Sequence, residues 1–193
     1  MTRIDPASLM SLEKYAKARP GYRARVLAHK KDRTIALGAN VTLIFEDELT
    51  IRYQIQEMLR IEKTFEEQGI LDELEVYDPL IPDGTNWKAT MLIEFPDAAE
   101  RKRQLALLRE VEHAVWAEVA GTRIVAAADE DMERSNAEKT SAVHFLRFEL
   151  PPEMRAALRG GAGLEIGIDH PACQARTGIV DPVRKSLLGD LAP

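Results

Sequence analysis

Cysteine is scarce in this sequence, and long hydrophobic runs are absent. The single cysteine, Cys173, excludes an internal disulfide and any zinc or iron–sulfur site that one chain builds from several cysteines. Since no run of about 18 apolar residues is present, we expect no membrane-spanning segment. The N-terminal stretch, MTRIDPASLMSLEKY, reaches charged residues before an apolar segment can form, which is unlike a secretory signal. We therefore expect a cytoplasmic protein.

The composition is typical of a globular protein with an uneven charge distribution. Of 193 residues, 45% are hydrophobic and 30% are charged, and we expect a single domain over residues 1–193. The net charge of -6 argues against nucleic-acid binding. Eight basic residues nevertheless lie close together, opposed locally only by Glu13 and Asp32: Lys14, Lys17, Arg19, Arg23, Arg25, Lys30, Lys31 and Arg33. They form either a solvated or salt-bridged helix face or a docking patch for an acidic partner or phosphate.

The hydrophobic pattern alternates between the period of strands and that of helices. Pro20 and Gly21 separate two short helices, and a hairpin around residues 38–40 leads into a long helix from Asp47 to Gln68. A strand at 86–95 leads into a second long helix, from Asp97 to about Val119. Further strands are predicted at 122–128, 142–150 and 164–170. This order favours an α/β (α+β) fold, a two-layer sandwich in which two long helices pack on a mixed or mostly antiparallel sheet.

One carboxylate falls in the middle of the apolar stripe of each long helix. At about 100° per residue, Glu62 lies among Ile51, Ile55 and Leu59, and Glu112 takes the same position in the second stripe. A buried carboxylate needs a cation, hydrogen-bond donors, a proton or water. The sequence leaves two main interpretations: an ion pair with an arginine, or a paired-carboxylate site for a metal or a proton. The candidate arginines are Arg25, Arg33, Arg101, Arg109 and Arg147.

Two histidines extend the apolar faces of predicted strands. His144 shares a face with Leu146 and Phe148, and His170 shares one with Ile166 and Ile168. Each is either a hydrogen-bonded histidine at the rim of the core or part of a site. If the two strands are adjacent and antiparallel, both histidines lie at one sheet edge below the acidic loop 129–133, where a small metal or ligand pocket could form. A parallel crossover would place them at opposite ends.

Several stretches carry a resemblance to a known family. They are HKKDRTIALGANVTLIFEDELTIRYQIQEMLRIEK, YDPLIPDGTNWKATMLIE, KTSAVHFLRFEL and IDHP, which together cover most of the chain. The sequence resembles the bacterial domain-of-unknown-function family three-five-zero-one. The resemblance implies a cytosolic protein whose gene lies near those for rubrerythrin-like proteins and an iron–sulfur oxidoreductase, and hence a link to peroxide defence or redox chemistry. The matching motif residues are Phe45, Glu46, Gln54, Gln56, Glu57, Met58, Arg60 and Glu62.

Two functions from different classes follow. No nucleophile elbow, glycine-rich phosphate loop or zinc-protease motif occurs, and no particular cofactor is indicated. We therefore expect a non-catalytic accessory protein that docks on an iron–sulfur oxidoreductase or a rubrerythrin-like protein. The alternative is a metal-dependent or small-ligand-binding enzyme. Its pocket would draw on a carboxylate, arginine and histidine set: Glu46, Glu57, Arg60, Glu62, Glu112, His144 and His170.

Overall fold

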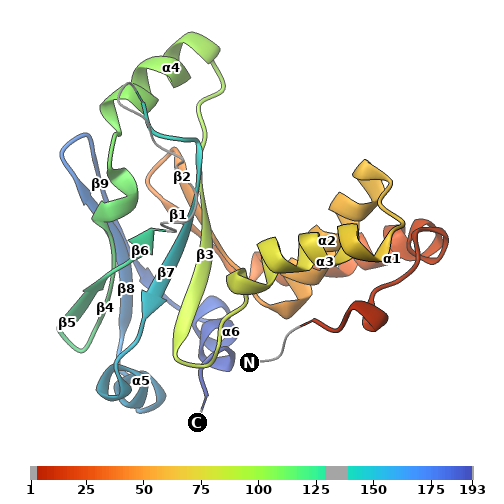
Figure 1. The fold of residues 1–193 in the computed structure, drawn as a ribbon. Coiled ribbons are helices and arrows are strands. Elements are labelled where there is room, and N and C mark those ends of the chain that lie inside the picture. Colours follow the sequence, from red (N-terminus) through yellow and green to blue (C-terminus); the bar gives the residue numbers. More distant parts are fainter. Residues whose placement is uncertain (1–3, 129–138, 193) are drawn as a thin grey trace.

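The computed structural model describes residues 4–128 and 139–192, and its strands form two antiparallel sheets (Figure 1). The first sheet has the order β1-β2-β3-β7-β6 and the second the order β5-β4-β8-β9. The first comprises β1 (Thr34–Leu37), β2 (Val41–Phe45), β3 (Asn86–Ile93), β6 (Ala127–Ala128) and β7 (Val143–Glu149). The second comprises β4 (Val115–Val119), β5 (Thr122–Val125), β8 (Leu164–His170) and β9 (Cys173–Ile179).

The main hydrophobic core lies between the two sheets. Alternate residues of β3, including Trp87 and Met91, are fully buried and pack in one cluster with Ile166 and Ile168 of β8. The alternation follows from the pleat, which turns successive side chains to opposite faces. In the second sheet, Gly167 stands opposite Trp116 in the register of β4 and β8, where its missing side chain makes room for the indole ring.

The first half of the chain contributes a separate helical unit, which projects from the sheets in Figure 1. It consists of η1 (Pro6–Ser8), α1 (Leu12–Lys31), α2 (Glu48–Glu62), α3 (Glu67–Tyr77) and η2 (Asp78–Leu80). Its own core is smaller and includes Ile51, Ile55 and Leu74, with Phe145 of β7 packed against it. The outer face of the first sheet therefore meets the helical unit.

The other helices lie at the ends of the sheets. They are α4 (Ala98–Leu107), η3 (Val111–Ala114), α5 (Pro152–Arg159) and α6 (Val183–Gly189). Figure 1 shows α4 and α5 at opposite ends. Trp87 Nε1 donates a hydrogen bond of 2.9 Å to the carbonyl of Leu187, which fastens α6 to the first sheet. In the part of the chain that the structure describes, no helix is long and apolar enough to cross a membrane.

The α+β class with antiparallel pairing is confirmed, and so is the hairpin joining β1 to β2. The prediction that the second long helix continues to about Val119 is wrong beyond Leu107. There α4 ends, Glu110 adopts a positive φ of 66°, and Val115–Val119 forms strand β4. Val115, Trp116 and Val119 are β-branched or aromatic, and pairing with β8 outweighs the helical spacing. The layer facing the first sheet is consequently a second sheet.

The helical unit also differs from the sequence prediction. α1 runs without a break through Pro20, so Pro20 and Gly21 do not separate two helices. α2 ends at Glu62, with Lys63 in the left-handed region, instead of continuing to Gln68. The expectation of one domain over residues 1–193 stays a prediction.

Candidate functional site

A cleft of about 260 Å³ separates the helical unit from the outer face of the first sheet. Its walls come from β2, β3 and β7 on one side and from α1, α2 and α3 with η2 on the other. Glu46, which directly follows β2, lines this cleft and is only 7% exposed. Its Oε1 accepts a 2.6 Å hydrogen bond from the hydroxyl of Thr90 on β3. Among residues 4–128 and 139–192, no group donates a hydrogen bond to its other oxygen.

Arg33 fixes the backbone on which Glu46 stands. This arginine is 1% exposed, and its Nε and Nη2 donate to the carbonyls of Phe45 and Glu46 at 2.8 and 2.9 Å. The remaining donors bind Ser186 at 3.1 Å and Asp190 at 3.2 and 2.6 Å. All five N–H groups of the guanidinium are thus used. Burial raises the pKa of the Asp190 carboxyl above its ordinary range, although Arg33 opposes the shift.

Glu57 clamps α1 onto α2. Its carboxylate receives hydrogen bonds from Tyr15 at 2.6 Å and from Arg19 at 2.7 and 2.8 Å, both on α1. Arg60, one turn along α2, reaches the same carboxylate at 3.4 Å. The hydrogen bonds from Arg19, and then those from Tyr15 and Arg60, lower the pKa of Glu57 from 4.5 to about 2 despite partial burial. Of the predicted site residues, Glu57 and Arg60 therefore lie together, in a structural role.

The clamp leaves most of α1 exposed to solvent. Over its 20 residues, only Tyr15 and Val26 are buried. Within the described residues, none of the following exposed chains forms a salt bridge: Lys14, Lys17, Arg23, Arg25 and Lys31. At about 100° per residue, Lys14, Lys17, Arg25 and Lys31 fall within about 120° of one another, on the side away from α2. We call these four residues the basic face.

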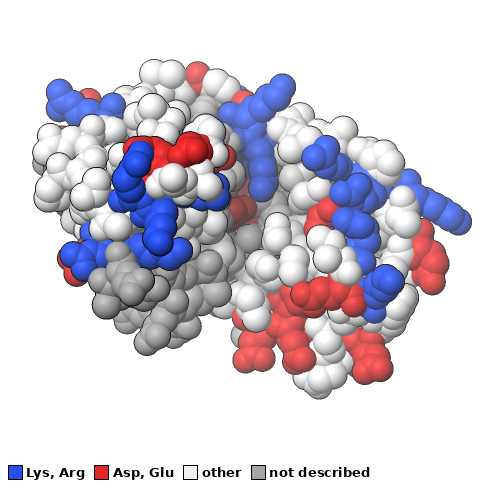
Figure 2. Space-filling model, turned by 90° about the horizontal axis from the view of Figure 1, so that it is seen from above, with Lys and Arg blue, Asp and Glu red and all other residues white. Residues whose placement is uncertain are grey.

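The helical unit is polarised by charge. Helix α1 carries seven Lys and Arg residues and one Glu, whereas helix α3 carries four Asp and Glu residues and no Lys or Arg. Figure 2 shows Lys and Arg gathered toward one edge of this part of the molecule and Asp and Glu along the other. The eight basic residues noted in the sequence thus divide: Arg33 is buried, Arg19 belongs to the clamp, Lys30 lines the cleft, and the others face solvent.

Glu62 is exposed, so the prediction that it breaks a buried stripe is wrong. α2 ends at this residue, and the buried stripe stops at Leu59. Ile61 and Phe65, on either side of Glu62, are also exposed. Glu62 acts on its neighbour across the turn: burial, and then the charge of Glu62, raise the pKa of Glu73.

Glu112 is buried as expected, but in a 3-10 turn instead of a long helix. Its Oε2 lies 3.9 Å from Nε2 of His144, and the hydroxyl of Thr140 lies between them, at 3.2 Å from Glu112 and 2.9 Å from His144. His144 Nε2 also lies 3.0 Å from the carbonyl of Ser141. The structure therefore brings together two residues that the sequence proposed for a site, inside the main core.

His170 does not join this pair. It stands on β8 in the second sheet, whereas His144 stands on β7 in the first, so the condition of adjacent strands is not met. Its Nδ1 accepts a hydrogen bond from the backbone N–H of Ala172 at 3.2 Å, so its Nε2 donates to the carbonyl of Arg109 at 3.0 Å. The imidazole thus fastens the β8 end to the chain that precedes η3.

The candidate carboxylates and histidines do not converge on one cavity. Among the described residues, no three His, Cys, Asp or Glu side chains are grouped so that they could hold a metal ion. The acidic loop 129–133, which the sequence placed above the histidines, lies outside the described residues.

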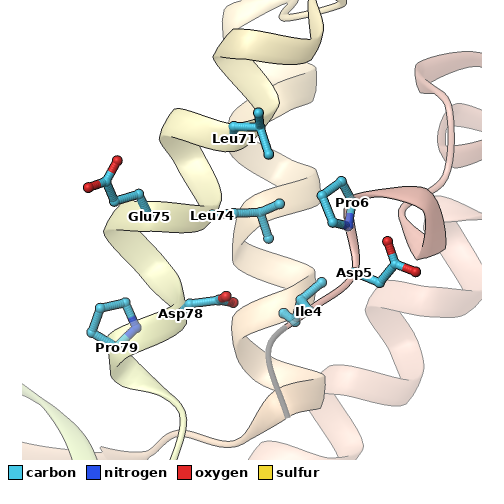
Figure 3. A pocket seen from close by; sticks show the side chains of 8 residues that line it. All are labelled: Ile4, Asp5, Pro6, Leu71, Leu74, Glu75, Asp78 and Pro79. Atoms are coloured by element: carbon cyan, nitrogen blue, oxygen red, sulfur yellow. The ribbon is translucent and has the colours of Figure 1, made fainter. Parts of the chain in front are cut away.

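A second hollow, of about 480 Å³, opens between the N-terminal segment and α3 (Figure 3). Leu71 and Leu74 of α3 face Ile4 and Pro6 across it. Glu75 and Asp78 add carboxylates to the α3 side, in line with the acidic character of that helix. This hollow belongs to the acidic edge of the helical unit, away from the basic face.

Sequence reasoning missed the partners of several of these residues. The i, i+4 spacing of Tyr15 and Arg19 places both on one face of α1 and was the available signal for the clamp. The pairing of Arg33 with Asp190 joins residues 157 positions apart, and no local pattern indicates it.

One comparison with known proteins shows the family, and another shows a solved structure with the same fold. A family model described as "Protein of unknown function (DUF3501)" matches residues 3–191. The fold is similar to a crystal structure of a novel protein of unknown function from Burkholderia pseudomallei K96243, with a TM-score of 0.93 and 51% sequence identity. The similarity covers 99% of this chain and 100% of that one. Among the curated proteins compared, none matches the chain.

Proposed function

The chain belongs to the DUF3501 family of proteins of unknown function, and we propose that it is a cytoplasmic, non-catalytic accessory protein that docks through the basic face of α1. The partner is a redox protein with an acidic surface, namely the iron–sulfur oxidoreductase or rubrerythrin-like protein that the family resemblance implies. The role is then in oxidative-stress defence. Docking requires an accessible and charged surface, and α1 offers both properties.

One observation carries this proposal. α1 is a helix of 20 residues with only two buried side chains, and its exposed Lys and Arg residues form no salt bridge with the described part of the chain. The Glu57 clamp holds the helix in place from its inner side, so the outer side is not needed for folding. A positive surface on a protein with a net charge of -6 favours an acidic partner and one docking orientation.

The test is a pull-down of each candidate partner with the full chain at low and raised salt. A variant with Lys14→Glu, Lys17→Glu and Lys31→Glu reverses three charges of the basic face. Exposed pairs contribute about 0.2–1 kcal/mol each, so we expect the affinity to fall about tenfold or more. Raised salt should weaken the wild-type complex because it screens exposed charges.

The matched control reverses three exposed charges elsewhere: Arg101→Glu and Lys102→Glu on α4, and Lys185→Glu on α6. It changes the net charge by the same amount and should bind as the wild type does. Equal loss in both variants would show a general charge effect, and absence of association at any ionic strength would refute docking on these partners.

A second candidate is favoured by the buried pair of Glu112 and His144, whose side chains approach to 3.9 Å in the core. A carboxylate and an imidazole are both metal ligands, which fits the alternative of a metal-dependent enzyme. Elemental analysis of protein purified without chelator tests it. Stoichiometric iron, manganese or zinc that is lost in His144→Ala without unfolding would support this candidate, whereas metal content unchanged by that substitution would count against it.

A further inference from the structure

The cleft beside Glu46 has the features of a small-molecule site, independently of the basic face. A volume of about 260 Å³ is just below the roughly 300–1,000 Å³ of pockets for drug-sized ligands, so its occupant is small. Most of the wall is apolar and comes from both sides of the cleft: Ile44, Ile51, Leu80, Leu92, Val143 and Phe145. A few polar groups on an apolar wall are the usual composition of a ligand pocket.

The polar groups of the cleft are incompletely paired within the described part of the chain. Glu46 is more than nine-tenths buried, and only one of its two carboxylate oxygens receives a hydrogen bond from the described residues. The side-chain amide of Gln54, across the cleft on α2, forms no hydrogen bond with the described part of the chain. Glu46 lines the cleft and its second oxygen is reached by water, so the cleft is suited to an occupant that supplies an N–H or O–H group in place of that water.

A positive charge lines the same cleft. Lys30, near the end of α1, forms no salt bridge in the described ranges, with Glu46 or with any other carboxylate. An occupant with only a positive charge would pair with Glu46 but be repelled by Lys30. An occupant with only a negative charge would pair with Lys30 but be repelled by Glu46. An occupant with both charges satisfies both groups.

From this arrangement we propose that the cleft binds a small zwitterion with an apolar side chain, of the apolar α-amino acid class. Its ammonium group donates to the free oxygen of Glu46, and its carboxylate pairs with Lys30. The side chain packs on Ile51, Leu92 and Phe145, which lie on both sides of the cleft. Such a ligand joins α2 to the first sheet and thereby stabilises the position of the helical unit.

The test uses the full chain and three probes of similar shape: leucine, isopentylamine and isovalerate. At about 10 mM, roughly tenfold above a weak Kd of about 1 mM, a ligand that binds only the folded state raises its stability and therefore the Tm. We expect leucine to raise the Tm and to bind in calorimetry, and each single-charge probe to bind at least about tenfold more weakly.

Two substitutions locate the binding. Glu46→Gln and Lys30→Met should each weaken leucine binding about tenfold or more, whereas Glu75→Gln, which removes a carboxylate from the other hollow, should not. Circular dichroism shows whether each variant is folded, and if Glu46→Gln does not fold, Lys30→Met and the two single-charge probes carry the test. No Tm shift with leucine, equal binding of the amine or the acid alone, or leucine binding unchanged in both Glu46→Gln and Lys30→Met would overturn the proposal. None of these variants changes the basic face, so the outcome is separate from that of docking.

Discussion

Removing the guanidinium of Arg33 should destabilise the protein severely. The substitution Arg33→Met leaves the carboxylate of Asp190, the hydroxyl of Ser186 and the carbonyls of Phe45 and Glu46 without their donor. Asp190 is nearly as buried as Arg33 and cannot turn to solvent without moving α6. Breaking a buried ion pair by removing one partner costs about 3–5 kcal/mol, out of the roughly 5–15 kcal/mol that stabilise a typical domain.

The assay is urea unfolding of the full chain, followed by circular dichroism. Arg103→Met is the matched control, because its partner Glu100 lies one turn away on an exposed face, and it should cost about 0.5 kcal/mol or less. Adding Asp190→Asn to Arg33→Met removes the unpaired charge, so the double variant should lose less than the sum of the single variants.

The loss of stability caused by Arg33→Met should also depend on pH. Burial raises the pKa of Asp190, and without the opposing arginine that pKa rises further, so a proton relieves the buried charge as the pH falls. We expect the loss to be smaller near pH 5 than near pH 8. A loss below about 1 kcal/mol, or additive effects of the two substitutions, would refute the account of Arg33 as the group that fixes the β2–α2 junction.

Two further perturbations test the clamp and the second sheet. Tyr15→Phe deletes one donor to Glu57 and should cost about 1–2 kcal/mol at pH 7 in urea unfolding. Because the folded-state pKa of Glu57 is lowered to about 2, the clamp stabilises the protein fully above about pH 4.5 and weakens as the pH falls toward 2. The stability lost in Tyr15→Phe should therefore shrink over this pH range, and a constant loss would contradict the role of the clamp. Gly167→Val places a Cβ 2.3 Å from the ring of Trp116 and should lower stability by about 1–3 kcal/mol or more in thermal unfolding. Gly178→Val, where nothing lies within 4 Å, is its control, and equal Tm values would refute the packing argument.

The sequence predicted the strands with clean alternation and missed elements that depend on long-range pairing. β3 and β8 were found because apolar residues alternate along them and one face of each is buried. Val115–Val119 was assigned to a helix because its apolar residues also fit a helical stripe with Leu105 and Leu108, and only pairing with β8 decides between the two. Strand β9 was missed because its sequence, CQARTGI, contains few apolar residues.

The candidate site was predictable where a residue's role is set locally. Glu112 was correctly expected to be buried, although the helical reasoning behind that expectation was wrong. Glu62 lies in the middle of an apolar stripe in the sequence but is exposed in the structure, because helix α2 ends at this residue. The partners of Glu46, Glu57 and Arg33 come from other elements, and a stripe argument shows that a carboxylate needs a partner without showing which.

The most direct test of the central claim is the association rate of the chain with the iron–sulfur oxidoreductase, measured by stopped flow over a range of salt concentrations. Docking through the basic face predicts a rate constant that falls steeply with ionic strength, because electrostatic steering is screened over about 10 Å at 0.1 M salt. The variant with Lys14, Lys17 and Lys31 reversed should associate more slowly at low salt and lose most of this dependence. A salt dependence that is the same for the wild type and that variant would contradict the account.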